Sequence, residues 1–85
     1  MYYVYILKSY RDSSLYVGYS SNLKERIKAH KYGDSIATKY KRPFEIIFYE
    51  AFKNKQDAKH REKYLKSGWG RRTIKKLLKR YFKNS

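Results

Sequence analysis

Glu62 is the acidic residue whose position most suggests chemistry. The chain has seven acids against 22 Lys and Arg, and only two of these acids lie within residues 53–85. Glu62 follows Ala58 by four residues and precedes Leu65 by three, so on a helix it falls on the inward face. A carboxylate there needs a bound metal ion or a neighbouring cation to offset its burial. The candidate cations for a salt bridge are Lys59, Arg61 and Lys66.

Arg26 and His30 form a second pair with chemical potential. They are four residues apart, and on a helix they flank Leu23 and Ile27. The planar guanidinium group of Arg matches phosphate, and an imidazole exchanges a proton near neutral pH. From spacing alone, a solvated helix flank with a partly buried histidine is the better explanation.

Tyrosine is concentrated in two short aromatic segments, residues 2–5 and 16–19. If the turn between them holds an even number of residues, Tyr5 and Tyr16 face the same side of a sheet. Tyrosine packs well in strands, and this alone explains its presence. A phenol can also stack on nucleic-acid bases or, in cationic surroundings, act as a base.

Three strands are expected to position these side chains. Residues 2–7 are aromatic and β-branched, residues 11–14 are turn-like, and residues 15–19 resume the strand pattern, which predicts a β-hairpin. Gly18 within the second strand predicts a close approach of another group to the backbone. A third strand is expected over residues 44–52, directly after Pro43.

Three helices are expected in addition. The first covers residues 22–32 with Ser21 or Asn22 as its N-cap, and the second runs from its N-cap Asn54 to about Lys66. Trp69-Gly70 is expected to be a joint before one last helix. Its apolar stripe consists of Ile74, Leu77, Leu78, Tyr81 and Phe82. The order ββαβαα predicts one α+β domain over residues 1–85, with a three-stranded antiparallel sheet flanked by helices.

The composition excludes several classes of protein. There is no Cys, so neither a disulfide framework nor a thiolate metal site is possible. The longest apolar run, residues 46–49, is far shorter than the roughly 20 residues that a bilayer span needs, and no signal peptide is expected. We expect a cytoplasmic protein without a membrane partner. A basic peripheral membrane protein that uses the helix after Trp69 is less economical, because the apolar stripe of that helix is better explained as core.

The net charge of +15 indicates a polyanionic partner. Residues 53–85 alone carry thirteen Lys and Arg against two acids. Cations that neutralise phosphates release condensed counterions, so nucleic acid is the natural partner, although a basic face that serves solubility remains an alternative. The residues expected to contact nucleic acid are Lys24, Lys39, Arg42, Lys59, Arg61, Lys66, Arg71 and Arg72.

Together, these residues resemble a known family of enzymes. Tyr3-Val4-Tyr5 and Tyr16-Val17-Gly18 stand at hairpin spacing, and Arg26, His30 and Glu62 follow in order. This pattern resembles the GIY-YIG nuclease superfamily, especially its small stand-alone bacterial members that are similar to the N-terminal domain of an excinuclease component. The resemblance covers nearly the whole chain and implies a metal-dependent phosphodiesterase.

The resemblance also implies a role for each residue. Tyr16 corresponds to the tyrosine that orients or deprotonates the attacking water, and Tyr5 to its partner in the first motif. Arg26 corresponds to the arginine that binds the scissile phosphate, and His30 to the histidine that tunes the water or the tyrosine. Glu62 corresponds to the single carboxylate ligand of the metal. One Mg²⁺ or Mn²⁺ ion is expected, bound mainly in the presence of substrate, because Mg²⁺ keeps several waters and uses phosphate oxygens as ligands.

Two functions remain open at this point. The first is a metal-dependent endonuclease that cuts DNA, at branched, damaged or single-stranded sites, without a small-molecule cofactor. The second is a DNA- or RNA-binding protein that keeps the scaffold but turns over slowly or not at all. The second stays open because the family often has an Asn after its metal-binding Glu, and here the only later Asn is Asn84.

Overall fold

A three-stranded antiparallel sheet forms the centre of the protein, for which a computed structural model describes residues 1–84. The strands are β1 (Tyr2–Ser9), β2 (Leu15–Ser20) and β3 (Phe44–Phe52), in the order β2-β1-β3. β1 is central because its side chains are apolar or aromatic on both faces, which suits a strand covered from two sides. The predicted α+β class and the order ββαβαα are confirmed.

The register of the hairpin places the two motif tyrosines on one face. Tyr5 pairs with Gly18 and Leu7 pairs with Tyr16, so the turn holds an even number of residues and the predicted orientation is correct. Gly18 has the expected close neighbour, because the ring of Tyr5 lies across it. A Cβ at Gly18 would come within 2.3 Å of the Tyr5 hydroxyl oxygen.

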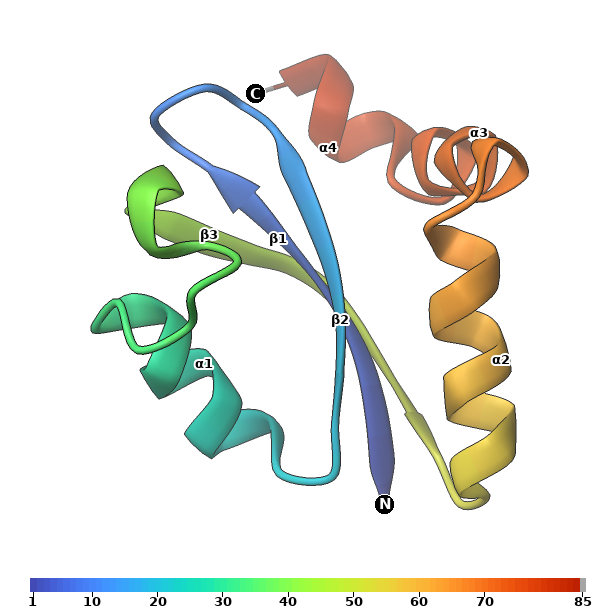
Figure 1. Ribbon diagram of the computed structural model, residues 1–85. Helices are drawn as coiled ribbons and strands as arrows, with labels where there is room; N and C mark the ends of the chain where they lie inside the picture. Colours follow the sequence, from blue (N-terminus) through green and yellow to red (C-terminus); the bar gives the residue numbers. More distant parts are fainter. Residues whose placement is uncertain (85) are drawn as a thin grey trace.

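The helices cover the two faces of the sheet unequally (Figure 1). α1 (Leu23–Lys31) and the 3₁₀ turn η1 (Lys39–Lys41) lie on one side, and α2 (Lys55–Leu65) lies on the other. Asn22 and Asn54 cap α1 and α2 through side-chain oxygens that accept backbone N–H groups, as predicted. No helix within residues 1–84 combines the length and apolar character needed to cross a membrane.

Alternate residues of β1 serve two different purposes. Val4 and Ile6 point toward α2 and form the buried core with Ala58, Leu65 and Ile74. Tyr5 and Leu7 point to the opposite face, where α1 packs, and are also buried. One face of the sheet therefore supplies most of the hydrophobic stabilisation, and the other carries the tyrosine and histidine residues of the candidate site.

The end of the chain differs from its prediction in two ways. Trp69 and Gly70 are not a joint, because they belong to the first turn of α3 (Gly68–Leu77), whose N-cap is Ser67. The single last helix was also wrong: α3 ends at Leu77, and a separate helix α4 (Lys79–Asn84) follows. The break lets Tyr81 donate a 2.6 Å hydrogen bond to Glu45 Oε2 at the start of β3.

Candidate active site

Three aromatic rings from three elements meet on the α1 face of the sheet. The ring centroids of Tyr5 and Tyr16 are 6.4 Å apart, and the His30 ring lies 5.6 Å from the first and 5.1 Å from the second. β1 and β2 supply the tyrosines as cross-strand neighbours, and the last turn of α1 supplies the histidine. The structure therefore brings together residues that are separated by up to 25 positions in the sequence.

The inner part of this cluster is closed to solvent. Tyr5 is 0% exposed, and His30 and Thr38 are each 1% exposed. The Tyr5 hydroxyl lies 2.7 Å from His30 Nε2, and His30 Nδ1 lies 2.6 Å from Thr38 Oγ1. These three residues form a buried polar chain in which each imidazole nitrogen has a partner, which removes the cost of leaving a buried polar group unpaired.

One arrangement of donors and acceptors satisfies every group in this chain and agrees with the interaction between Arg26 and Tyr5. A guanidinium group can only donate, so the Tyr5 oxygen accepts from Arg26 and its O–H is free to donate to His30 Nε2. A neutral imidazole then carries its proton on Nδ1 and donates it to Thr38 Oγ1. In this arrangement the exposed Arg26 donates to Tyr5, and within the buried chain Tyr5 donates to His30 and His30 donates to Thr38.

Burial keeps both inner titratable groups neutral. It raises the pKa of Tyr5 to about 12, against the opposing effect of a hydrogen bond from Arg26. It also lowers the pKa of His30 from 6.5 to about 4, and the nearby Arg26 charge acts in the same direction. At neutral pH Tyr5 therefore keeps its proton and His30 carries no charge, so both are suited to hold neighbouring groups in place.

Tyr16 and Arg26 form the accessible part of the cluster. Tyr16 is half-buried on β2, and Arg26 is exposed one helical turn before His30. A hydrogen bond to Tyr5, followed by a weaker effect of Tyr16, raises the pKa of Arg26 above its usual range. The guanidinium therefore serves both phenols, and its remaining N–H groups face solvent, where an anion can approach.

Glu62 lies on α2 and acts on the cluster through its charge. Its side chain is 18% exposed, and its charge contributes to the raised pKa of Tyr5. Lys66 Nζ lies 2.9 Å from Glu62 Oε2, so one of the salt bridges considered from the sequence is present. Arg61, another candidate partner, instead binds Glu50 through two hydrogen bonds of 2.8 and 3.3 Å.

A single carboxylate limits which metal this site could hold. Among residues 1–84, no group of three or more His, Cys, Asp or Glu side chains is placed to bind one ion together. A lone Glu oxygen suits Mg²⁺, which retains water and completes its octahedron with phosphate oxygens, whereas Zn²⁺ requires several protein ligands. The donor set therefore fits a Mg²⁺ or Mn²⁺ ion held jointly with substrate, in competition with the Lys66 ammonium group.

The basic residues expected to contact nucleic acid differ in their surroundings. Lys24, Arg42 and Arg71 are exposed. Lys59 and Arg72 lie over aromatic rings, with Lys59 Nζ 4.1 Å from the centroid of Tyr19. Lys39 lies over the ring of Tyr40. Arg61 and Lys66 are held by Glu50 and Glu62 as described above, so they are the least available of the set.

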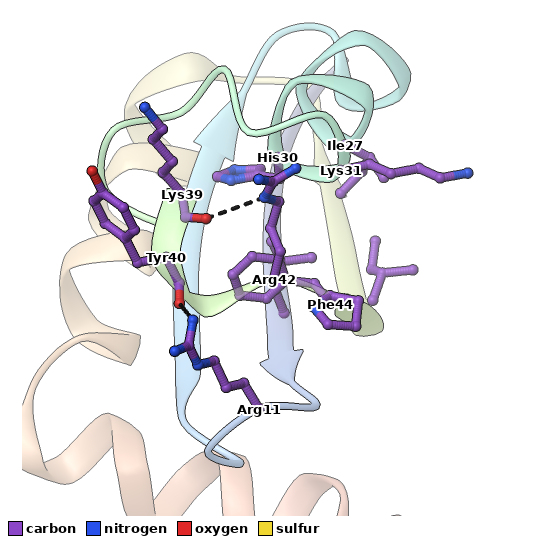
Figure 2. A pocket seen from close by; sticks show the side chains of 11 residues that line it. Arg11, Ile27, His30, Lys31, Lys39, Tyr40, Arg42 and Phe44 are labelled. Atoms are coloured by element: carbon purple, nitrogen blue, oxygen red, sulfur yellow. Dashed lines mark hydrogen bonds between the residues drawn. The ribbon is translucent and has the colours of Figure 1, made fainter.

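A cavity of about 600 Å³ adjoins the buried chain at His30 (Figure 2). Its walls come from α1, from the segment between residues 39 and 43, and from the first residues of β3. The edge of the His30 ring faces Phe44 across this region, with 6.3 Å between the ring centroids. His30 therefore connects the tyrosine cluster on one side with this cavity on the other.

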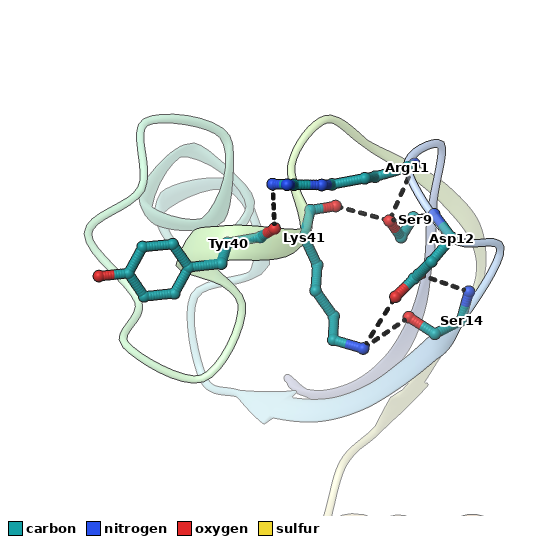
Figure 3. A network of polar contacts seen from close by, with 6 residues as sticks. All are labelled: Ser9, Arg11, Asp12, Ser14, Tyr40 and Lys41. Atoms are coloured by element: carbon teal, nitrogen blue, oxygen red, sulfur yellow. Dashed lines mark hydrogen bonds and ion pairs between the residues drawn. The ribbon is translucent and has the colours of Figure 1, made fainter.

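Thr38 and the turn that follows it are the part of the site that the sequence did not reveal. The turn is tied to the β1–β2 hairpin by a polar network, in which Ser9 Oγ donates to the Lys41 carbonyl at 2.6 Å and Lys41 Nζ lies 3.0 Å from Asp12 (Figure 3). Hydrogen bonds from Ser14, together with Lys41, hold the pKa of Asp12 well below its usual range. The sequence marked this segment only by the polar, basic composition of residues 36–42 and by Thr38-Lys39-Tyr40 ahead of Arg42-Pro43, which also resembles the small members of the family, and neither signal indicated the contact with His30.

Comparison with known proteins agrees with this geometry. The family model described as "GIY-YIG catalytic domain" matches residues 1–81. The chain is 48% identical over 69 residues to the UPF0213 protein CPE1444 of Clostridium perfringens, which covers 78% of this chain and 71% of that protein. It is 40% identical over 65 residues to the UPF0213 protein YazA of Bacillus subtilis, covering 75% of this chain and 65% of that one.

A solved structure is similar as well. The solution NMR structure of the UPF0213 protein BH0048 from Bacillus halodurans has a TM-score of 0.57 and 33% sequence identity, covering 91% of this chain and 85% of that one. The sequence matches and the structural match extend over most of the chain, and the family match over residues 1–81 includes the strands and α1 that carry the tyrosine cluster. The chain therefore belongs to the GIY-YIG family, whose catalytic domain it contains.

Proposed function

We propose that this protein is a metal-dependent endonuclease that hydrolyses phosphodiester bonds in DNA. The observation that carries the proposal is the cluster of Tyr5, Tyr16 and His30 rings next to the exposed Arg26, together with the charge of Glu62 that acts on Tyr5. A nuclease of this family would need these groups around one phosphate. The net charge of +15 supports the choice of a polyanionic substrate.

Arg26 would bind the scissile phosphate. Its position is fixed from behind by the buried Tyr5 oxygen, so its outward N–H groups are pre-oriented before substrate arrives. A guanidinium group can make two parallel hydrogen bonds to phosphate oxygens and stabilise the negative charge that develops on them during hydrolysis. Preorganisation by Tyr5 would make this stabilisation more effective than that of a freely rotating arginine.

Tyr16 would orient or deprotonate the attacking water. It is the accessible phenol of the pair, and it lies beside both Arg26 and His30. A water hydrogen-bonded to its oxygen would stand next to a phosphate bound on Arg26, which is the geometry that an in-line attack requires.

Tyr5, His30 and Thr38 would position these two residues. They are too deeply buried to touch the scissile phosphate, and at neutral pH Tyr5 is protonated and His30 is uncharged. Their hydrogen bonds fix the tilt of the Tyr5 ring and, through the Tyr5 oxygen, the place of Arg26. His30 would thus influence the position of Arg26 through Tyr5.

Glu62 would hold the divalent cation. When bound, Mg²⁺ or Mn²⁺ would supply Lewis-acid activation of the phosphate and stabilise the leaving oxygen. The carboxylate would have to release Lys66, which is half-exposed and free to move toward a phosphate of the substrate. The other expected basic residues would hold the strand on either side of the site.

The direct test is cleavage of a panel of labelled substrates in Mg²⁺, Mn²⁺ and EDTA. The panel comprises duplex, flap, junction and single-stranded DNA, together with single-stranded RNA. Products that form with either metal and disappear in EDTA support the proposal. Cleavage that persists in EDTA would contradict it.

A second candidate function is nucleic-acid binding without turnover. The observation that favours it is the Lys66–Glu62 ion pair of 2.9 Å, which occupies the only carboxylate near the cluster among residues 1–84. In this case, the panel would show tight binding that weakens steeply with salt, and no products under any metal condition.

A further inference from the structure

The cavity beside His30 has a lining whose chemistry points to a particular ligand. Four cationic side chains border it, and no acidic residue does: Arg11, Lys31, Lys39 and Arg42. None of the ion pairs among residues 1–84 involves these four. A concave site bordered by unneutralised cations binds anions. Phosphate is the anion that the proposed substrate carries.

Two of the cations are held in place before any ligand binds. Arg11 Nη1 donates to the Tyr40 carbonyl at 2.9 Å, and Arg42 Nε donates to the Lys39 carbonyl at 3.1 Å (Figure 2). The Arg42 guanidinium also packs against Gly33, which has a positive φ of 80° and where a Cβ would come within 2.9 Å of it. Each guanidinium uses one N–H on the backbone and keeps the others for a ligand.

The remaining lining of the cavity is apolar and aromatic. Phe44, Pro43 and Ile27 of α1 line it, and Tyr40 stands at its border. Tyr40 is 74% exposed at the border of the cavity. At about 600 Å³ the cavity lies within the range of roughly 300–1,000 Å³ that small-molecule sites occupy, which is sufficient for a heterocyclic base with its sugar and phosphate.

We propose that this cavity, bordered by Arg11, Lys39, Arg42, Tyr40 and Phe44 next to His30, is a nucleotide-binding site that receives one unstacked nucleotide of the nucleic-acid strand. The base would lie against the aromatic and apolar lining, and its phosphate would bind the guanidinium and ammonium groups. Stacking of a base on an aromatic side chain is worth enough to compensate for removing that base from its neighbours.

This nucleotide site extends the proposed nuclease function. It rests on that proposal for the statement that the bound nucleotide belongs to a nucleic-acid strand. His30 lines the cavity and also bonds to Tyr5, so a single side chain links a nucleotide bound there to the tyrosine and arginine cluster. The strand would therefore be anchored by one inserted nucleotide while an adjacent phosphate lies on Arg26. This arrangement would select single-stranded or locally unpaired positions.

A second cavity, of about 620 Å³, continues from the first along α1. The two share Ile27, Lys31 and Ile46, and the second adds Lys24 and Lys28 without an acidic residue. It gives the strand a basic path away from the inserted nucleotide. A short oligonucleotide should therefore bind more tightly than a mononucleotide does.

The test uses amide chemical shifts of the full ¹⁵N-labelled chain, measured by NMR without any metal. The probes are adenosine 5′-monophosphate, adenosine, inorganic phosphate, a five-nucleotide single strand, and a blunt duplex that contains the same sequence. We expect the mononucleotide and the single strand to shift amides of residues 27–31 and 39–46, with the single strand binding more tightly. Adenosine and inorganic phosphate should each bind at least fivefold more weakly than the mononucleotide.

Three variants sharpen this experiment. Tyr40→Ala should weaken mononucleotide binding roughly fivefold or more by removing an aromatic surface, and Arg42→Gln should weaken it to a similar extent by removing a phosphate contact. Lys63→Gln is the control, because Lys63 is exposed on α2 outside both cavities and its loss changes the net charge equally. This control should bind as the unsubstituted protein does.

The proposal is overturned if inorganic phosphate binds as well as the mononucleotide, if the shifts lie outside the cavity, or if the duplex shifts the same amides as strongly as the single strand. It is also overturned if Lys63→Gln weakens binding as much as Arg42→Gln. Because no cleavage is measured, a failure here is distinct from a failure of the nuclease proposal, which is judged by products in the metal-dependent assay.

Discussion

His30 determines how the stability of this protein should depend on pH. Its folded-state pKa is about 4, against 6.5 in an unfolded chain, so the unfolded state gains the proton first as the pH falls. The stability that depends on neutral His30 is complete above about pH 6.5 and is lost as the pH falls toward 4. We expect the free energy of unfolding in urea to drop by about 2 kcal/mol between pH 7 and pH 5.

Two variants separate His30 from the other titrating groups. His30→Gln should flatten the pH dependence of the unfolding free energy in this interval, because the imidazole that binds its proton more tightly in the unfolded chain would be gone. His60→Gln should leave the dependence unchanged, because His60 is exposed on α2. Equal pH dependence in the His30→Gln variant and the unsubstituted protein would contradict the assignment.

The hydroxyl of Thr38 is the second residue-scale feature with a measurable consequence. Thr38→Val keeps the shape of the side chain but leaves the buried Nδ1–H of His30 without an acceptor. We expect a loss of about 1–3 kcal/mol in unfolding free energy. Thr38→Ser restores the acceptor and should recover most of that loss. Equal stability of the Val and Ser variants would show that the hydroxyl does not hold His30.

The sequence predicted which residues belong to the site better than it predicted how deeply each of them is buried. Residue type and spacing selected Tyr5, Tyr16, Arg26 and His30 only together with the resemblance to a known family, and the structure places these four residues together. They did not show that Tyr5 and His30 are buried behind the other two. Nor could they reveal Thr38, because its contact with His30 depends on the path of residues 32–42, which have no periodic pattern.

At the scale of elements, the contact between α2 and α3 depends on the absence of one side chain. A Cβ at Gly70 would lie 2.1 Å from the Tyr64 carbonyl oxygen and 2.4 Å from Leu65 Cα, so neither backbone could accommodate it. Gly70→Ala should therefore destabilise the protein by more than about 2 kcal/mol, measured as the free energy of unfolding in urea.

Gly68→Ala provides a matched control in the same helix. A Cβ at Gly68 meets no atom within 4 Å, so this substitution should be neutral or slightly stabilising, since alanine favours a helix more than glycine does. If both variants lose stability equally, the close packing of α2 on α3 is not the reason for Gly70.

The same glycines explain why the beginning of α3 was not predicted. Two glycines around Trp69 indicate a break by propensity, whereas tertiary packing on α2 requires one of them inside the helix. The break between α3 and α4 could not be predicted from the sequence either. The apolar stripe of residues 74–82 is continuous in sequence, and the bond from Tyr81 to Glu45 that accompanies the break joins residues 36 positions apart.

At the scale of the whole molecule, the excess of positive charge should govern affinity for nucleic acid. Each phosphate contact that is removed should reduce the slope of log K against log salt by about 0.7 on a single strand. We expect the double variant Arg71→Gln, Arg72→Gln to reduce the slope by about 1.4, measured by fluorescence anisotropy across a salt series. Both residues are exposed on α3.

Lys75→Gln combined with Lys76→Gln removes the same charge from the same helix. These two lysines are also exposed but are not expected to contact the strand. Their loss should change the slope less than the arginine substitutions do. Equal changes for the two double variants would mean that net charge alone, and no defined contact, explains the salt dependence.

The central claim is that Glu62 supports metal-dependent hydrolysis around Tyr16 and Arg26, and single-turnover cleavage by Glu62→Gln tests it most directly. Substrate binding is measured on the same samples, and Glu25→Gln is the matched control, because Glu25 is an exposed helical carboxylate whose partner Lys28 lies 3.9 Å away. We expect Glu62→Gln to bind DNA as tightly as the unsubstituted chain yet to cleave it at least a hundredfold more slowly in Mg²⁺, with Glu25→Gln unaffected. Cleavage at an undiminished rate by Glu62→Gln would contradict the account.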